Sequence, residues 1–347
     1  MALLARIDPP HRRCPRAHSH GRRVRRQSDG DEVPQPSSTS STEQVAPGVM
    51  AALLARARGL PLTSELLARC SIPESSVPLD CAVSGGADSV ALAVLAAAHG
   101  NPVTLWHVDH GLRHNSFEEA RVVESLANGL GAKFESRRVH IDNGPNLEAR
   151  ARIARYEVLP RGVLTGHTAD DQAETVLINL LRGASSSGLA GMRPNPNRPL
   201  LSIRRSETHA LCTALRITPI VDEMNDDQKF LRVRVRKELL PLISDIATRD
   251  IVPVLTRQAD LLRADDDLLN SLAAEIDPTD AVEISRAPLA LARRAVRNWL
   301  TDEYPPDLAT VDRVLDVARG NTPGCDIGGK RQVRRTAQRL RIESITP

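Results

Sequence analysis

Ala82-Val83-Ser84-Gly85-Gly86-Ala87-Asp88-Ser89 is the stretch that decides the fold. It ends a short apolar run, Leu79–Val83, and opens a longer one, Val90–Ala98, which has the length of a helix. A strand that breaks at glycines and passes directly into a helix directs backbone N–H groups and the positive end of the helix dipole at one spot. The stretch therefore predicts a phosphate site, and with it a bound nucleotide.

The side chains of this turn suit the same ligand. Glycines let the backbone approach an anion, serine hydroxyls donate hydrogen bonds, and a carboxylate can hold a magnesium ion that bridges phosphate oxygens. A Walker loop is excluded, because no Lys-Ser or Lys-Thr ending follows at the longer glycine spacing. A plain strand-to-helix connection stays open as the structural alternative. We predict nucleotide contacts from Ser84, Gly85, Gly86, Ala87, Asp88 and Ser89, with Asp88 also catalytic and metal-binding.

Length and composition leave room for an ordinary enzyme. The 347 residues suffice for about two domains, and the chain is 41% hydrophobic and 26% charged. No apolar stretch is long enough to span a bilayer, so we expect a soluble protein with no membrane partner. The five cysteines form no CxxC pair, which argues against a disulfide framework or an iron–sulfur site and fits a reducing cytoplasm.

The first 48 residues differ from the rest of the chain. They carry eight arginines and three histidines, followed by a Pro/Ser/Thr-rich run, Pro34–Thr42. Too few apolar groups are present to offset the entropy of ordering, so residues 1–48 are predicted to be a disordered extension. Contact with nucleic acid and a targeting role are the alternatives for its arginines, although an apolar signal-peptide core is absent.

Strands and helices alternate through the body of the chain. Apolar strand-like runs cover Pro102–Val108, Phe134–Ile141 and Gly162–Gly166, and helical patterns cover Glu118–Leu130, Asn146–Leu159 and Asp170–Leu181. Such alternation predicts an α/β fold with a parallel sheet and helices on both faces. Ligands of these sheets bind at the carboxyl ends of the strands, and three polar clusters fall there.

The C-terminal third has a different pattern. Apolar residues at helical spacing over Ile251–Ile276 predict a long linker helix, and Leu289–Leu300, Leu308–Arg319 and a hairpin near Gly328–Arg335 predict a small α+β domain. From Ile284 onward 12 Lys/Arg face 7 Asp/Glu, which suits a phosphate backbone. We predict a catalytic domain over 49–245, a helical linker over 246–280 and a small basic domain over 281–347, whose charge suits nucleic acid, with a solvated charged face as the alternative.

A second polar cluster, His107-Val108-Asp109-His110-Gly111-Leu112-Arg113, closes the second strand. Alternating strand positions face opposite sides, which favours a buried His107 and a free His110 over a metal site. We predict that His110 contacts the nucleotide and that the Arg113 guanidinium stabilises charge on a triphosphate, with a structural salt bridge as the alternative.

The third cluster, Gly166–Thr175, places His167 and three carboxylates at a strand end. Asp170 and Asp171 open a helix, and Glu174 follows one turn later. Acidic residues in a first turn are common dipole partners and caps. Three of them beside a histidine exceed what a cap requires, so we predict catalytic roles for Asp171 and Glu174.

Together the three clusters resemble the N-type ATP pyrophosphatases and, within them, the tRNA(Ile)-lysidine synthetases. The resemblance runs from Ala82 to about Pro241 and includes Asn146–Tyr156, Leu181-Arg182-Gly183 and Gly188-Leu189-Ala190-Gly191-Met192. The turn belongs to the whole superfamily, whereas the His-Gly-Leu-Arg string and the Gly-Leu-x-Gly-Met segment are specific to the synthetases. The implied fold is of the adenine nucleotide alpha hydrolase type, and the resemblance implies that the basic domain over 281–347 binds tRNA.

This resemblance implies a reaction. ATP, with Mg²⁺, would adenylate the wobble cytosine in the CAU anticodon of tRNA(Ile), and L-lysine would then displace AMP. Asp171 and Glu174 would bind the lysine ammonium and accept its proton, because an amine is nucleophilic only when deprotonated. Four arginines could face the tRNA backbone or the triphosphate, with a solvated helix face as the alternative: Arg150, Arg152, Arg155 and Arg182.

The sequence departs from the family in one segment. Asp222-Glu223-Met224-Asn225 stands where the family has Asp-x-Ser/Thr-Asn, and Arg232-Val233 replaces an Arg-Asn pair. Alternatives are another adenylating enzyme of the superfamily, acting in tRNA thiolation or like an NAD or GMP synthetase, and a nonenzymatic nucleotide- or RNA-binding module. The oligomeric state stays open, a homodimer included.

Overall fold

The computed structural model describes residues 47–109, 116–139, 147–220 and 230–345. The predictions for the N-terminal extension, for His110 and Arg113, and for the departure at 222–225 lie outside these residues.

A parallel sheet of three strands carries the first half of the described chain. Its strands are β1 (Leu79–Ala82), β2 (Val103–Asp109) and β3 (Lys133–Arg138), hydrogen-bonded in the order β1-β2-β3. Cys81 pairs with Leu105 in the register of β1 and β2, and both side chains are fully buried. The parallel α/β fold predicted from the alternating pattern is confirmed, and all carboxyl ends of these strands meet at one edge of the sheet.

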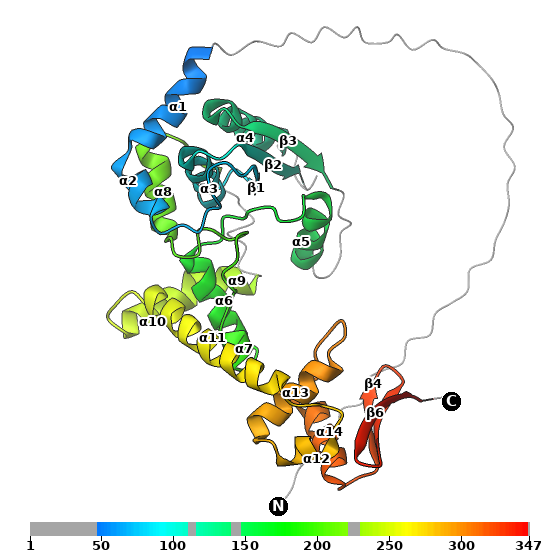
Figure 1. The fold of residues 1–347 in the computed structure, drawn as a ribbon. Coiled ribbons are helices and arrows are strands. Elements are labelled where there is room, and N and C mark those ends of the chain that lie inside the picture. The colour runs from blue at the N-terminus through cyan, green and yellow to red at the C-terminus, as the bar shows by residue number, and fades with distance from the viewer. Residues whose placement is uncertain (1–46, 110–115, 140–146, 221–229, 346–347) are drawn as a thin grey trace, which may run out of the picture. The chain divides into compact units, whose positions relative to one another are not determined.

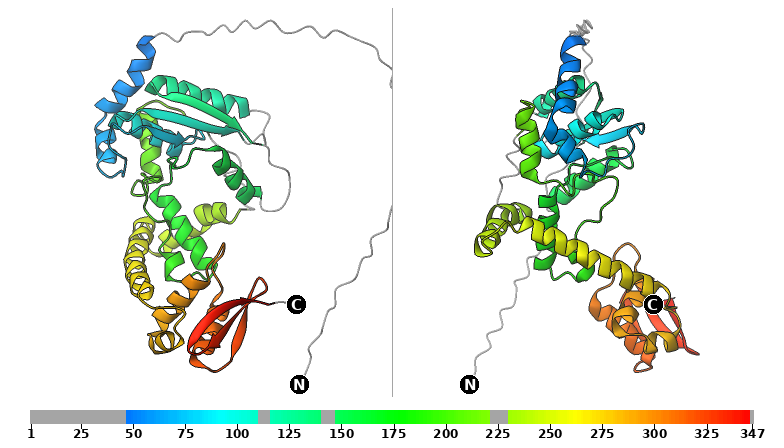
Figure 2. Two further views of the ribbon diagram at one scale, coloured as in Figure 1. Left: turned by 45° about the vertical axis from the view of Figure 1, so that its right-hand side comes forward. Right: turned by 60° about the vertical axis from the view of Figure 1, so that its left-hand side comes forward.

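Helices follow the strands in turn. The first three after β1 are α3 (Ala87–His99), α4 (Ser116–Leu130) and α5 (Leu147–Val158), and Figures 1 and 2 show α4 and α5 on opposite sides of the sheet. Because α3 is apolar all round, it is buried all round: it packs against strands, α1 (Pro47–Gly59) and α8 (Arg205–Ala214). The helix α2 (Pro61–Leu67) begins at the proline that interrupts the apolar pattern after Gly59.

The strand predicted over Gly162–Gly166 is reduced to one bridge. The Leu164 amide donates to the Asp80 carbonyl (2.8 Å), and its carbonyl accepts from the Ala82 amide (2.9 Å). The next amide donates instead to the carbonyl of Asn197, outside the sheet (2.8 Å). The segment thus pairs with β1 through this one residue, and the Thr165 amide, which faces away from β1 as alternate strand residues do, bonds to a loop instead.

The second half is helical and ends in a small sheet. α6 (Ala169–Leu181) packs against the long α11 (Val252–Ala274), which confirms the predicted linker helix. The shorter helical segments are α7 (Ser186–Leu189), α9 (Leu231–Arg234), the π-helix η2 (Val235–Leu239), α10 (Leu240–Ile246) and α12 (Ala281–Arg286). The C-terminal elements are α13 (Leu289–Leu300), α14 (Leu308–Arg319) and the antiparallel strands β4 (Gly324–Gly328), β5 (Arg331–Thr336) and β6 (Arg339–Ser344).

Three apolar cores hold these parts. One surrounds α3 and the parallel sheet, a second joins α6 to α10 and α11, and a third lies between α12, α13, α14 and the antiparallel sheet. The third core confirms a small α+β unit, while the domain boundaries themselves stay predictions. None of the helices among the described residues combines the length and apolarity that a membrane span requires.

Candidate active site

The glycine turn after β1 is held by its own side chains. The Ser89 hydroxyl donates to the Gly86 carbonyl (2.8 Å) and accepts from the Ser84 amide (3.2 Å). Gly85 has φ +88°, and a Cβ there would lie 2.3 Å from Cδ1 of Ile220. Only glycine satisfies both conditions, because the left-handed region and the close side chain each disfavour a Cβ.

The N-terminus of α3 is open. Gly86 occupies the N-cap position and provides no side chain to cap the first turn. Gly166 packs against the same turn, so closely that a Cβ would lie 2.6 Å from the Asp88 carbonyl oxygen. First-turn N–H groups without a cap, at the positive end of a helix, are the arrangement that binds phosphate.

A cavity of about 640 Å³ lies in front of this turn. Its size is typical of small-molecule sites. The turn, the end of β2, the start of α6 and three arginines from other segments contribute to its wall. The lining residues include Ser84, Asp88, His107, Asp171, Arg155, Arg205 and Arg236. The structure therefore brings the phosphate turn and the acidic helix start to one cavity.

Asp88, in the first turn of α3, is already engaged. Its Oδ1 accepts from the hydroxyl of the fully buried Thr208 (2.5 Å), and its Oδ2 accepts from Nε of Arg205 (3.2 Å). Burial raises the pKa of the Asp88 carboxyl, although Thr208 and Arg205 act in the opposite direction. A carboxylate held at the phosphate turn from two sides can present an oxygen to a cation with little rearrangement.

The N-terminus of α6 is capped by its own first residues. The amide (2.8 Å) and hydroxyl (2.9 Å) of Thr168 both donate to Oδ2 of Asp171, and Oδ1 accepts from Nη2 of Arg205 (3.0 Å). Burial alone would raise the pKa of Asp171, but Arg205 and the Thr168 amide outweigh it, so this pKa is lowered. Asp171 is thus held ionised at the cavity wall.

Glu174 is fully buried and surrounded by arginines. Its Oε1 accepts from Nη1 of Arg205 (3.0 Å) and Nε of Arg236 (2.7 Å). Its Oε2 accepts from Nε of Arg232 (2.9 Å) and Nη2 of Arg236 (3.2 Å). The role of Glu174 in an amine pocket stays a prediction; in this structure its carboxylate holds three guanidinium groups.

The second polar cluster is described only in part. His107 is buried, as predicted, and its Nδ1 lies 3.0 Å from the Val83 carbonyl, which fixes the proton on Nδ1 because a carbonyl only accepts. Asp109 pairs with Nε of Arg138 (3.2 Å). Among the described residues, no group of three or more His, Cys, Asp or Glu is arranged to hold a metal ion.

The four arginines predicted to face tRNA or the triphosphate differ in where they lie. Arg155 lines the cavity, whereas Arg182 lies exposed at the C-terminal end of α6. Arg150 is partly buried, and the side chain of Arg152 lies outside the described residues.

Sequence analysis missed the residues that complete the site: Thr208, Arg205, Arg232 and Arg236. A signal was present for two of them. Arginines alternate in Leu231–Arg236, and positions four apart share one face of a helix. Arg205 and Thr208 gave no such signal, because their partners are far away in the sequence.

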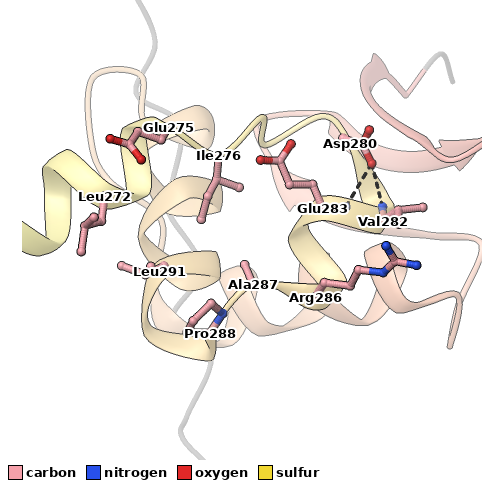
Figure 3. A pocket seen from close by; sticks show the side chains of 10 residues that line it. All are labelled: Leu272, Glu275, Ile276, Asp280, Val282, Glu283, Arg286, Ala287, Pro288 and Leu291. Atoms are coloured by element: carbon pink, nitrogen blue, oxygen red, sulfur yellow. Dashed lines mark hydrogen bonds between the residues drawn. The ribbon is translucent and has the colours of Figure 1, made fainter.

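A second cavity of similar volume lies between α11, α12 and α13 (Figure 3). Its lining is largely aliphatic, with Leu272, Ile276 and Leu291 beside a few charged groups. Asp280, one of these groups, is the N-cap of α12 and accepts from the amides of Val282 and Glu283. We therefore place the chemistry at the first cavity.

A glycine turn between a parallel strand and an open helix, with carboxylates across one cavity, defines a nucleotide-binding α/β protein of the ATP pyrophosphatase class. Residues 65–243 match the family model of the PP-loop domain. The chain is 39% identical to a tRNA(Ile)-lysidine synthase of Nocardia farcinica over 279 residues, which cover 74% of this chain and 87% of the relative. A second such enzyme, from Mycolicibacterium paratuberculosis, is 42% identical over 259 residues (69% and 81%). The chain belongs to the tRNA(Ile)-lysidine synthase family.

Among solved structures, the U34-tRNA thiolase NcsA from Methanococcus maripaludis aligns with a TM-score of 0.46 at 16% identity, covering 61% of this chain and 80% of that chain. This likeness is too loose to bear on function.

Proposed function

We propose that this chain uses ATP to join L-lysine to the wobble cytidine of tRNA(Ile) with a CAU anticodon, forming lysidine. Membership of the family supports the reaction class. The observation that carries it in the structure is the open N-terminus of α3, which faces the same cavity as the carboxylate of Asp171.

The reaction has two steps. The carbonyl oxygen of the cytosine bonds to the α-phosphorus of ATP, and the bond to the β-phosphate breaks to release pyrophosphate. The lysine ε-amine then bonds to the activated ring carbon, loses a proton, and expels AMP. The first step needs stabilisation of phosphate charge, and the second needs carboxylates that bind an ammonium group and accept a proton.

The phosphate side falls to the turn. The N–H groups of Gly86, Ala87 and Asp88 and the hydroxyls of Ser84 and Ser89 would donate to phosphate oxygens. Mg²⁺ prefers oxygen ligands and is commonly bound through one or two carboxylates plus substrate phosphates, which Asp88 fits. When bound there, the ion would neutralise charge on the phosphates.

The amine side falls to α6. Asp171, held ionised at the cavity wall, would attract the lysine ammonium, with Glu174 behind it. We also propose, from the sequence, that His110 contacts the nucleotide and that the Arg113 guanidinium stabilises the charge of the triphosphate.

The C-terminal domain would bind the tRNA. Arg334 and Arg341 are directly opposite on β5 and β6, and both are exposed. Like charges in directly opposite positions destabilise a sheet, and a phosphate backbone would relieve that repulsion.

Incubation with ATP, labelled lysine and total tRNA, followed by nucleoside analysis, tests the proposal. Lysidine in the digest, with AMP and pyrophosphate in equal amounts, is the expected result. Pyrophosphate release that tRNA does not stimulate would favour a small-molecule synthetase, and ATP binding without AMP would favour a nonenzymatic module.

Asp88→Ala should abolish turnover, because the phosphate turn loses its only carboxylate and Arg205 loses a partner. AMP release in the same assay measures the effect, and a circular dichroism melt checks that the variant is folded. AMP production near the wild-type rate would refute a metal role for Asp88.

A further inference from the structure

The buried carboxylate of Glu174 is contacted by three guanidinium groups. A carboxylate has about four acceptor positions, and Glu174 receives four N–H contacts from Arg205, Arg232 and Arg236. Two of these arginines also meet neighbouring carboxylates: Arg205 pairs with Asp88 and Asp171, and Nη2 of Arg236 lies 3.8 Å from Oδ1 of Asp171. The cluster thus balances three guanidinium groups with three carboxylates, and a further anion can bind only through the N–H groups that these pairs leave over.

Two of the three arginines reach the cavity. Arg205 and Arg236 are among its lining residues, together with Ser84 and Ser89 of the phosphate turn. Nε of Arg205 lies 3.2 Å from Oδ2 of Asp88, so this guanidinium lies beside the first turn of α3.

Both guanidinium groups keep donors for a ligand. A guanidinium has five N–H groups, and Arg205 uses one hydrogen bond on each of its three nitrogens, to Asp88, Glu174 and Asp171. Arg236 uses Nε and Nη2 on Glu174, and no described residue accepts from its Nη1. The remaining donors can bind phosphate oxygens in the planar geometry that Arg provides.

The local backbone supports a functional role for Arg236. The helix that begins with α9 changes to the π-helix Val235–Leu239 at this point, and π-helical turns occur frequently at functional sites. Arg232 and Arg236 both reach Glu174 across this change. Arg234, between them, is exposed and pairs with Glu238 in the next turn (3.0 Å).

We propose that Arg205 and Arg236, fixed by Glu174, bind the β- and γ-phosphates of ATP and so stabilise the departing pyrophosphate. This inference rests on the proposed function. As the oxygen–α-phosphorus bond forms, the bond from the α-phosphorus to the bridging oxygen breaks, and its electron pair adds negative charge to pyrophosphate. Guanidinium groups already positioned at that charge lower the barrier without reorganising. Glu174 is in this view a positioning residue, which acts through the arginines.

The test uses pyrophosphate as the probe. Its affinity for the full-length protein is measured by calorimetry without tRNA or lysine, with and without Mg²⁺, for wild type, Arg236→Gln and the matched control Arg234→Gln. We expect at least tenfold weaker pyrophosphate binding in R236Q, a raised KM for ATP and a lysine KM within twofold of wild type. R234Q should match wild type throughout. Equal pyrophosphate affinities for R236Q and R234Q, or an effect confined to the lysine KM, would overturn the inference.

Glu174→Gln gives a second readout. Loss of the charge should weaken pyrophosphate binding in the same direction and leave the lysine KM unchanged, whereas an amine-binding Glu174 would raise the lysine KM alone. If E174Q does not fold, the comparison of R236Q with R234Q decides. Lysidine formation with normal pyrophosphate binding in R236Q would reject this inference alone; no lysidine in the wild type would reject the proposed function while leaving the pyrophosphate result intact.

Discussion

The helices α3 and α6 both begin at the same cavity, but the backbone N–H groups of their first turns differ in whether they are capped. The first turn of α3 starts at Gly86, where no side chain caps it. The first turn of α6 is closed: Thr168 donates to Asp171, and the Ala169 amide donates to the carbonyl of Ile203 (2.8 Å). An open helix N-terminus attracts anions, while one satisfied by its own carboxylate presents negative charge instead.

This difference divides the cavity into two walls. The wall at α3 is made of backbone and hydroxyl donors, with the Asp88 carboxylate beside them. The wall at α6 presents the Asp171 carboxylate, which stays ionised because Arg205 and the Thr168 amide outweigh its burial. Glu174 lies behind this wall and pairs with arginines from α8, α9 and η2. A triphosphate and an ammonium group are substrates of opposite charge, and one cavity can receive both when its two walls differ in this way.

The largest effect on turnover should come from a substitution in the glycine turn at the uncapped N-terminus of α3. Gly85→Ala introduces a Cβ at a strained φ of +88°, 2.3 Å from Cδ1 of Ile220, so the turn or the Ile220 side chain that packs on it must shift. We expect ATP-dependent turnover to fall by more than about a hundredfold, because a displaced turn misplaces the phosphates. AMP release at saturating ATP measures this.

The matched control is Gly131→Ala, at a glycine with φ +67° and no atom within 4 Å of a new Cβ. It should cost about 1 kcal/mol of stability and leave turnover unchanged. Equal turnover in G85A and G131A would show that the turn does not bind the phosphates.

A smaller effect, on the free energy of unfolding, should come from a substitution at the capped N-terminus of α6. The pKa of Asp171 is lowered in the folded state, so its contribution to stability is complete above the unfolded pKa of about 3.9 and is lost as pH falls through the folded value. Asp171→Asn should lower the free energy of unfolding by about 3 kcal/mol at pH 7. Urea unfolding should show this difference shrinking below about pH 4.

Asp260→Asn is the control for that series, since its pair with Arg263 is on the surface, where Asp260 is 67% exposed. It should change stability by less than about 0.5 kcal/mol at either pH. A D171N difference that stays constant between pH 7 and pH 3 would contradict the ionised state of Asp171.

The two walls also differ in how far the sequence predicts them. The turn at α3 is local, since strand, glycines and helix follow one another. The sequence placed the turn correctly between a strand and a helix, although the helix begins at Ala87, three residues before the predicted apolar run. The arginines around Glu174 come from 31, 58 and 62 residues away, so no local pattern joins them to their carboxylate. The strand predicted over Gly162–Gly166 exceeds the one bridge observed at Leu164 for a related reason: a local apolar run does not show how many of its residues pair with β1, which is distant in sequence.

The smallest effect should come from removing a single hydroxyl, that of Thr168, from the cap of α6. Thr168 is fully buried, and Thr168→Val keeps its shape and its backbone bond to Asp171 while removing the hydroxyl bond. We expect a loss of about 1 kcal/mol in the free energy of unfolding, the usual contribution of one such hydrogen bond. Denaturant unfolding measures it. The KM for ATP should stay within twofold of wild type, because the Thr168 amide still donates to Asp171, whose other oxygen still accepts from Arg205. A tenfold rise in that KM would mean that the Thr168 hydroxyl is needed to position Asp171 and, through Arg205, the phosphate site, and the contrast between the two helix starts would then fail.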